Sequence, residues 1–178
     1  MSNHPALVPN RVAVVTGAAS GIGLAASAKF VAHGMKVCMA DANRPALEAA
    51  AAQLRATAAR PEDVRSFVID VSNFDDVERL KTSVYEAFGE VALLMNNAGI
   101  GGGGGLTGDR AKWRRIVRVN LWGVINGVQV FAPTMIRQGS VSAIVNTGSK
   151  QGITCPPGDT AYNVSKAPLK ALAESLAA

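Results

Sequence analysis

The sequence contains few of the residues that bind metals or form disulfide bonds. Its 178 residues include two cysteines and two histidines. Cys38 falls in a predicted core strand and Cys155 in a predicted loop, which indicates neither a disulfide framework nor a cysteine-rich metal site. His4 and His33 stand alone in the sequence, as surface histidines commonly do. We therefore expect no metal site, and the scarcity of cysteine fits a reduced, cytoplasmic setting.

The chain also lacks long charged runs. Its 18 lysines and arginines against 13 aspartates and glutamates give a formal net charge of +5, but the basic residues are dispersed. Dispersed charge does not indicate a nucleic-acid surface. Residues 1–10 have neither the basic start nor the apolar core of a signal peptide or membrane span. We expect no nucleic-acid or membrane partner, and we expect residues 1–10 to form a loose tail.

Residues 11–178 show apolar patterns that predict one domain of alternating strands and helices. Short apolar runs predict strands at 12–15, 36–40, 64–69, 91–95 and 141–147. Segments with apolar residues at helical spacing separate these strands, and the longest runs from Asp109 to Met135, where Pro133 ends or kinks it. Ser72 and Asp75 predict a capping box at the start of another helix. This alternation is typical of an α/β fold, a doubly wound parallel sheet of Rossmann type with helices on both faces.

The most informative stretch is a glycine-rich turn between the first predicted strand and a helix. It contains Gly17, Gly21 and Gly23, with Ser20 in the position of an N-cap. Glycine lets the backbone approach a pyrophosphate closely, and the N-terminus of the next helix offers unpaired N–H groups to the anion. The spacing Gly-x-x-x-Gly-x-Gly differs from the general dinucleotide fingerprint, so the motif must be judged in its context. We interpret it as a phosphate-binding turn.

Asp41 ends the second predicted strand, 18 residues after Gly23. A dinucleotide fold places there the carboxylate that accepts hydrogen bonds from the adenosine ribose. Because a carboxylate would repel a 2′-phosphate, Asp41 favours NAD over NADP. The alternative is a solvated residue at a strand end or a helix cap. Asp70, Asn96 and Ser149 also lie at or near strand ends, which meet on one edge of a parallel sheet.

A second constellation lies in the last part of the chain. Tyr162 and Lys166 are four residues apart and therefore share one face of a predicted helix, and Ser149 precedes Tyr162 by 13 residues. Together with the glycine turn and Asn97-Ala98-Gly99, this set resembles the short-chain dehydrogenase/reductase family over nearly the whole chain. The resemblance implies an NAD(P)-dependent oxidoreductase that moves a hydride between nicotinamide and an alcohol or carbonyl substrate.

The resemblance also implies a role for each catalytic residue. Tyr162 would be the general acid/base, Ser149 would hold the substrate oxygen, and Lys166 would bind the nicotinamide ribose and favour the ionised tyrosine. Asn120 matches a helix asparagine that holds a proton-relay water to the lysine in this family. Its alternative is a polar helix residue whose side chain is satisfied by the backbone.

The same resemblance implies a path for the cofactor along the predicted sheet edge. The glycine turn would line the pyrophosphate, Asp41 the adenosine ribose, Asp70 and Val71 the adenine, and residues 97–99 the nicotinamide side. The full set of expected cofactor-binding residues is Gly17, Ser20, Gly21, Ile22, Gly23, Asp41, Asp70, Val71, Asn97, Ala98, Gly99, Tyr162 and Lys166. For the full-length form the family implies a dimer or tetramer formed through two long helices.

The sequence departs from the family after the Tyr-x-x-x-Lys helix. Family members continue into further strands and a substrate lid, whereas this sequence ends inside an apolar helix and looks truncated. We therefore expect the strand at 141–147 to form an exposed sheet edge prone to pairing or aggregation. Pro168 inside the last helix is a further departure. The alternative function is a dinucleotide-binding or subunit-interaction module without turnover, and activity with a simple secondary alcohol would separate the two.

Overall fold

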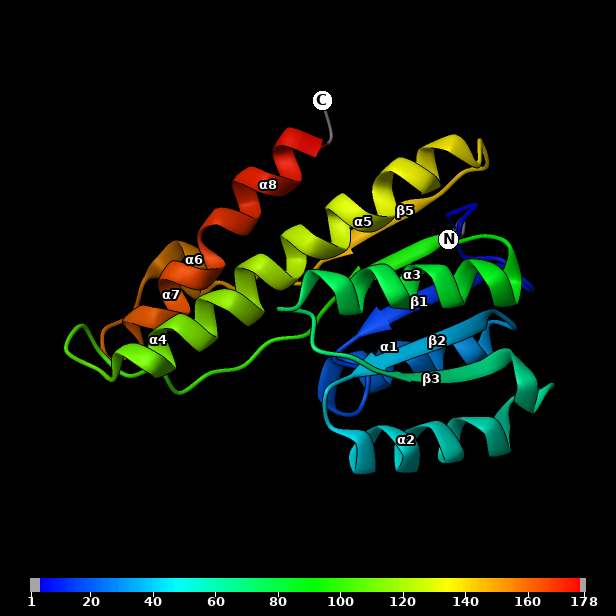
Figure 1. The fold of residues 1–178 in the computed structure, drawn as a ribbon, viewed down its shortest axis with the longest axis horizontal. Helices are drawn as coiled ribbons and strands as arrows, with labels where there is room; N and C mark the ends of the chain where they lie inside the picture. Colours follow the sequence, from blue (N-terminus) through cyan, green and yellow to red (C-terminus); the bar gives the residue numbers. More distant parts are fainter. Residues whose placement is uncertain (1–3, 177–178) are drawn as a thin grey trace.

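The computed structural model describes residues 4–176, which form a parallel five-stranded sheet with helices on both faces (Figure 1). The strands are β1 (Val12–Thr16), β2 (Lys36–Asp41), β3 (Val64–Val68), β4 (Leu93–Asn96) and β5 (Ala143–Asn146). Their order across the sheet is β3-β2-β1-β4-β5, and every neighbouring pair is parallel. The predicted α/β fold with about five parallel strands is confirmed.

The connecting segments are mostly helical. They are α1 (Gly21–Ala32), α2 (Arg44–Thr57), α3 (Phe74–Phe88), α4 (Arg110–Val117), α5 (Gly123–Arg137), α6 (Gln151–Thr154), α7 (Thr160–Lys166) and α8 (Pro168–Leu176), with a 3-10 turn at Pro61–Asp63 and a π-helical turn, η2, at Arg118–Trp122. Figure 1 shows α3 in front of the sheet and α1 behind it. The arrow of β1 points towards α4 and α7, so these helices lie beyond the carboxyl ends of the strands.

Alternating strand residues build a core on each face of the sheet. Val14, Cys38 and Leu94 face α3 and α5, whereas Val15 and Met39 face α1 and α2. All these side chains are buried, as expected for strands covered on both sides. The two cores explain why the strands read as continuous apolar runs rather than as alternating patterns.

Helix boundaries differ from the predicted ones at two places. The side chain that caps α3 is Asn73, which accepts a hydrogen bond from the N–H of Asp75 at 3.0 Å, so the predicted capping box at Ser72 is wrong by one residue. Pro133 lies inside α5, which continues to Arg137 and does not end at the proline.

Pro168 begins a helix of its own. The α7 helix ends at Lys166 and α8 starts at Pro168, and Ala167 between them has helical φ and ψ angles and donates to the carbonyl of Asn163 at 3.0 Å. A proline tolerates the first helical position because its missing N–H would have no partner there. The boundary between α7 and α8 therefore falls at Pro168, and Lys166 lies at the end of α7.

Helices α4, η2 and α5 form one continuous helical run from Arg110 to Arg137. The run has 28 residues, and its most apolar window has a mean hydropathy of 1.2, which would suffice to cross a membrane by length and composition. Half of that window is buried inside the protein, and Val128 and Phe131 lie in the core against the sheet. Its apolar character is therefore accounted for by packing.

Residues 4–10 pack against the body of the protein with two apolar side chains, while the rest of the segment is exposed. Ala6 is fully buried, and Leu7 packs against Ala13 and Leu93. Residues 1–3 lie outside the described residues. These two contacts tie the segment to the body at Ala6 and Leu7, and the loose tail stays a prediction.

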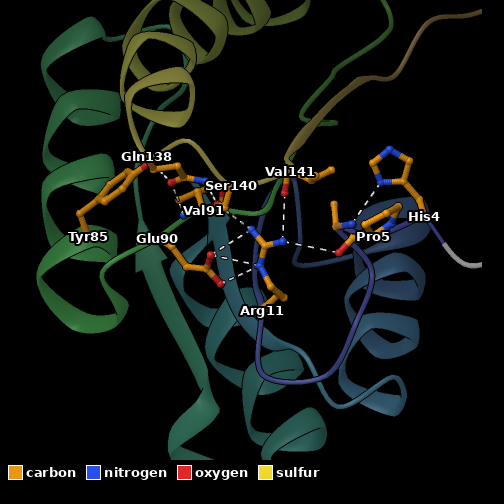
Figure 2. Close-up of polar contacts among 10 residues, drawn as sticks. His4, Pro5, Arg11, Tyr85, Glu90, Val91, Gln138, Ser140 and Val141 are labelled. Atoms are coloured by element: carbon orange, nitrogen blue, oxygen red, sulfur yellow. Dashed lines mark hydrogen bonds and ion pairs between the residues drawn. The ribbon is translucent and has the colours of Figure 1, made fainter.

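Arg11, just before β1, forms hydrogen bonds with residues near the amino ends of the strands (Figure 2). Its guanidinium donates to both carboxylate oxygens of Glu90 at 3.0 and 3.1 Å and to the carbonyl of Val141 at 3.0 Å. It also donates to Ser140 Oγ at 3.0 Å and to the carbonyl of Pro5 at 3.5 Å. One side chain thus joins the N-terminal segment to the turns before β4 and β5, at the end of the sheet opposite the glycine turn.

Strand β5 forms one edge of the sheet in the described part of the chain, as predicted, since it pairs only with β4. Val141 before the strand and Val145 within it are 53% and 44% exposed, and Ile136 at the end of α5 is 77% exposed. An edge strand beside exposed apolar side chains offers unpaired backbone groups to another chain. Pairing or aggregation at this edge stays a prediction.

The buried thiol of Cys38 predicts a measurable loss of stability at alkaline pH. Burial raises the pKa of Cys38 from 9.0 to about 12, a shift that nearby Arg65 partly opposes. The unfolded chain therefore loses this proton above pH 9 while the folded chain keeps it, so the stabilisation is complete below pH 9 and is lost as pH rises towards 12. At pH 10.5 the wild type should have lost about 2 kcal/mol more unfolding free energy, relative to pH 8, than Cys38→Ala. Urea denaturation at both pH values measures this, and equal pH slopes for the two proteins would contradict it.

Candidate functional site

The carboxyl ends of the strands open into a cleft of about 1250 Å³. Its walls come from the glycine turn, from the segments after β2, β3 and β4, and from helices α4 and α7. The predicted residues that line it are Gly17, Ser20, Gly21, Ile22, Asp41, Asp70, Val71, Asn97, Ala98, Gly99, Tyr162 and Lys166. Gly23, Asn120 and Ser149 do not line it. The cleft therefore brings together residues from most of the length of the chain.

The glycine turn needs glycine for two different reasons. Gly17 and Gly21 have φ values of +66° and +53°, a region that other residues rarely adopt. At Gly23, a Cβ would overlap the carbonyl oxygen of Gly17 and lie 2.6 Å from Asn97 Nδ2. The first N–H groups of α1 have no intrahelical partner, and the side chain of Ser20 at the N-cap position does not bond to them. The turn thus offers backbone donors and close approach to an anion.

Asn97 holds the ends of three strands together. Its Nδ2 donates to the carbonyls of Thr16 and Gly17 at 3.1 and 3.3 Å, and its Oδ1 accepts from Thr147 Oγ1 at 3.2 Å. The N–H groups of Asn97 and Ala98 both donate to Thr16 Oγ1, at 2.9 and 3.1 Å. The side chain of Asn97 is committed to this scaffold, so it shapes the cleft floor. No pattern in the sequence identifies Thr16 or Thr147 as a partner of Asn97.

Asp41 is half-buried at the end of β2 and bonds to the backbone on two sides. Its Oδ2 accepts from the N–H of Ala19 at 3.1 Å, and its Oδ1 accepts from the N–H of Asn43 at 2.9 Å. Asn43 is the N-cap of α2, so Asp41 itself is not the helix cap. Each carboxylate oxygen can accept further hydrogen bonds. Asp41 therefore joins the glycine turn to β2 and still faces the cleft.

Tyr162 and Lys166 lie on the same side of α7. Lys166 Nζ is 5.9 Å from the centre of the Tyr162 ring and donates to the carbonyl of Thr147 at 2.8 Å. Burial lowers the pKa of Lys166, because a cation loses hydration there. The Thr147 carbonyl partly replaces that hydration. Ser149 follows Thr147 by two residues, and its Oγ accepts from the N–H of Gln151 at 3.2 Å.

Asn120 is fully buried in the π-helical turn η2. Its Oδ1 accepts from the N–H of Ile100 at 2.8 Å, and its Nδ2 donates to the Ile100 carbonyl at 2.9 Å and to Ser165 Oγ at 3.0 Å. These contacts fit the alternative of a side chain satisfied by the backbone, while a relay role stays a prediction. π-Helical turns occur frequently at functional sites. Asn120 thus fixes the segment after β4 next to Lys166.

The cleft has one wall that our sequence analysis missed. Arg110, Arg114, Arg115 and Arg118 of α4 and η2 all line it, although their charges looked dispersed along the sequence. The sequence feature that indicates this basic wall is the absence of any aspartate or glutamate between Asp109 and Asp159. Asn126 was also missed, and its buried Nδ2 donates to the carbonyl of Val71 at 2.9 Å. Among residues 4–176, no group of three or more histidine, cysteine or acidic side chains could hold a metal ion.

A glycine turn before a helix, a carboxylate at the end of β2 and a cleft at the carboxyl edge of a parallel sheet define a doubly wound α/β protein of Rossmann type. The chain belongs to the short chain dehydrogenase family, whose family model matches residues 11–178.

Individual relatives agree with this assignment. The chain is 37% identical to 1-deoxy-11-beta-hydroxypentalenate dehydrogenase of Streptomyces arenae, with 94% of this chain and 60% of the relative covered. It is 32% identical to 3beta-hydroxysteroid dehydrogenase 2 of Eggerthella lenta, with 99% and 67% covered. A crystal structure of a short chain dehydrogenase/reductase from Burkholderia phymatum in complex with NAD matches with a TM-score of 0.91 and 41% identity, covering 96% of this chain and 60% of that one. The chain therefore spans about 60% of the length of the first and third of these proteins.

Proposed function

We propose that the chain binds NAD in the cleft and that its protein transfers a hydride between nicotinamide and a small alcohol or carbonyl substrate. The observation that carries this proposal is that Tyr162 and Lys166 line the same cleft as the glycine turn. A similar protein has been solved with NAD, and the names of two relatives describe dehydrogenases. We also propose a cytoplasmic location, a dimer or tetramer in the full-length form, and no nucleic-acid or membrane partner.

The residues present fit a dinucleotide. A Cβ at Gly17 would lie 2.7 Å from Ala98 Cα, so glycine there keeps the backbones close and leaves the turn open to an anion. Unpaired N–H groups at the start of α1 would hold the pyrophosphate, and Asp41 would accept from the adenosine ribose. Asp70 and Val71 would lie at the adenine, and Gly99 on the nicotinamide side. When bound, the nicotinamide supplies the hydride acceptor or donor.

Tyr162 would exchange a proton between its hydroxyl oxygen and the substrate oxygen. Ionising a tyrosine at pH 7 costs roughly 4 kcal/mol, which a neighbouring cation reduces. Lys166 is the cation closest in sequence to this position, held by the Thr147 carbonyl. Asn120 would hold a relay water to Lys166. Each of these roles is carried by a side chain at or next to the cleft.

Ser149 would donate a hydrogen bond to the same substrate oxygen. Its hydroxyl accepts from the N–H of Gln151 and therefore keeps its own proton to donate. A donor aimed at the oxygen would stabilise negative charge as it develops.

Dinucleotide binding or subunit interaction without turnover is the second candidate function. It is favoured by one observation, namely that Ser149 does not line the cleft. Turnover of a simple secondary alcohol, followed as NADH formation, separates the two candidates. NAD binding without detectable turnover would favour the second.

Thermal unfolding with NAD and NADP tests the cofactor site. NAD at roughly 100 times its dissociation constant should raise the unfolding midpoint by about 5–11 °C.

Asp41→Ala should lower the affinity for NAD about 10-fold and the affinity for NADP less. The substitution removes a charged acceptor from the ribose, but it also removes a repulsion from the 2′-phosphate. Titration calorimetry with both cofactors measures the two affinities.

The matched control is Asp41→Asn, because Asp41 also holds the N–H of Ala19 in the glycine turn. Asparagine removes the charge and keeps one acceptor oxygen, so it can accept from the N–H of Ala19 or from that of Asn43 but not from both. It should therefore reduce the ratio of NAD affinity to NADP affinity, and it should lower the unfolding midpoint without cofactor less than Asp41→Ala, which removes both acceptors. Equal losses for NAD and NADP in both variants would contradict the ribose role of Asp41.

A further inference from the structure

One face of the α4–η2 helical run lines the cleft, starting next to the residues that follow β3. Ala111, Arg115 and Val119 line the cleft and are four residues apart, which places them on one helix face. The next residue on that face is Gly123, where a Cβ would lie 2.6 Å from Val71 Cγ2. The face therefore starts against Val71 and runs outward past Val119 to Arg115.

The inner part of this face borders an apolar trough. Ile69 and Val71 are buried at the end of β3, and half-buried Val119 packs against the same cluster. Arg115 lies eight residues before Gly123, about two helical turns along this run. A flat ring resting on Val119 and Val71 would fit in that interval, with Arg115 at its outer side.

The guanidinium of Arg115 is available to a ligand. Arg115 is exposed, and it makes neither an ion pair nor a side-chain hydrogen bond within residues 4–176. The chain has no acidic residue between Asp109 and Asp159 that could neutralise it locally. A guanidinium is planar and weakly hydrated, so it stacks on aromatic rings in a way that an ammonium cannot.

We propose that Arg115 is a positioning residue of the cofactor site whose guanidinium lies against the adenine ring and closes the trough formed by Ile69, Val71 and Val119. The inference rests on the proposed binding of NAD with its adenine at Val71. Arg115 makes no contact with the reacting atoms, and its contribution is to the affinity for the adenosine half of the cofactor.

Titration calorimetry with fragments of the cofactor tests this inference. The probes are AMP, ribose 5-phosphate, which lacks the base, and nicotinamide mononucleotide, which lacks the adenosine half. Arg115→Ala should weaken AMP and NAD about 5- to 10-fold and change the other two probes less than about twofold. Arg115→Lys keeps the positive charge but lacks the planar guanidinium. Its affinity for AMP should therefore stay as low as that of Arg115→Ala.

The control variant is Lys112→Ala, which removes one charge from the same helix at a position outside the cleft lining. It should bind AMP as the wild type does, and all variants should unfold at the wild-type midpoint without ligand. Equal losses for AMP and ribose 5-phosphate, full recovery in Arg115→Lys, or unchanged AMP binding in Arg115→Ala would each overturn the inference alone. A wild-type chain that binds none of the probes or NAD would overturn the proposed function, and the inference with it.

Discussion

Tyr162→Phe is expected to lower turnover about a thousandfold while leaving NAD binding nearly unchanged. The substitution removes one hydroxyl, and that hydroxyl makes no hydrogen bond within residues 4–176, so no structural contact is lost with it. The ring keeps its place on α7, at 5.9 Å from Lys166 Nζ. The loss should therefore fall on the proton transfer alone. NADH formation from a secondary alcohol measures turnover, and calorimetry measures NAD affinity.

Tyr85 provides the matched control, since it is the other tyrosine of the chain. Its hydroxyl donates to Gln138 Oε1 at 3.0 Å, beside the Arg11 contacts at the opposite end of the sheet (Figure 2). Tyr85→Phe makes the same chemical change far from the cleft, so it should cost some stability and leave turnover unaltered. Undiminished turnover in Tyr162→Phe would remove Tyr162 from its proposed role, whatever the control shows.

The fold could be predicted from local patterns because the central strands β1, β2 and β4 are largely buried on both faces and α2, α3 and α5 each have a buried apolar face. Boundaries were harder to predict where two residues of similar chemistry are adjacent. Ser72 and Asn73 are both good N-cap residues, and the chain uses Asn73. Which of them caps α3 depends on where the chain leaves β3, and a local pattern does not contain that information.

The contacts of Asn120 in the π-helical turn and the arginine wall were missed for two further reasons. Asn120 bonds to Ile100, 20 residues earlier, and no residue near η2 signals that contact. The arginines do not form a run, but Arg110, Arg114 and Arg118 recur every four residues and so share a helix face. Testing the charges for helical spacing, and not only for runs, would have revealed this wall.

Gly23→Ala is expected to damage both the cofactor site and the fold. The added Cβ would overlap the carbonyl oxygen of Gly17 and lie 2.6 Å from Asn97 Nδ2. Neither atom can yield cheaply, because one is backbone and the other is held by bonds to Thr16 and Gly17. The turn must open, which should cost about 2–3 kcal/mol of unfolding free energy and lower the midpoint by about 4–12 °C. NAD affinity should fall about 100-fold, because opening the turn moves the backbone N–H groups that would hold the pyrophosphate.

Gly105→Ala separates this clash from the general effect of adding a methyl group to a glycine. A Cβ at Gly105 would meet nothing within 4 Å, and its φ is not positive, so the change should stay within about 0.5 kcal/mol. Thermal unfolding of both variants, with and without NAD, compares the two positions. If Gly23→Ala unfolded and bound NAD like Gly105→Ala, the close approach of α1 to Gly17 would not be needed. The glycine turn would then owe its form to the positive φ angles of Gly17 and Gly21 alone.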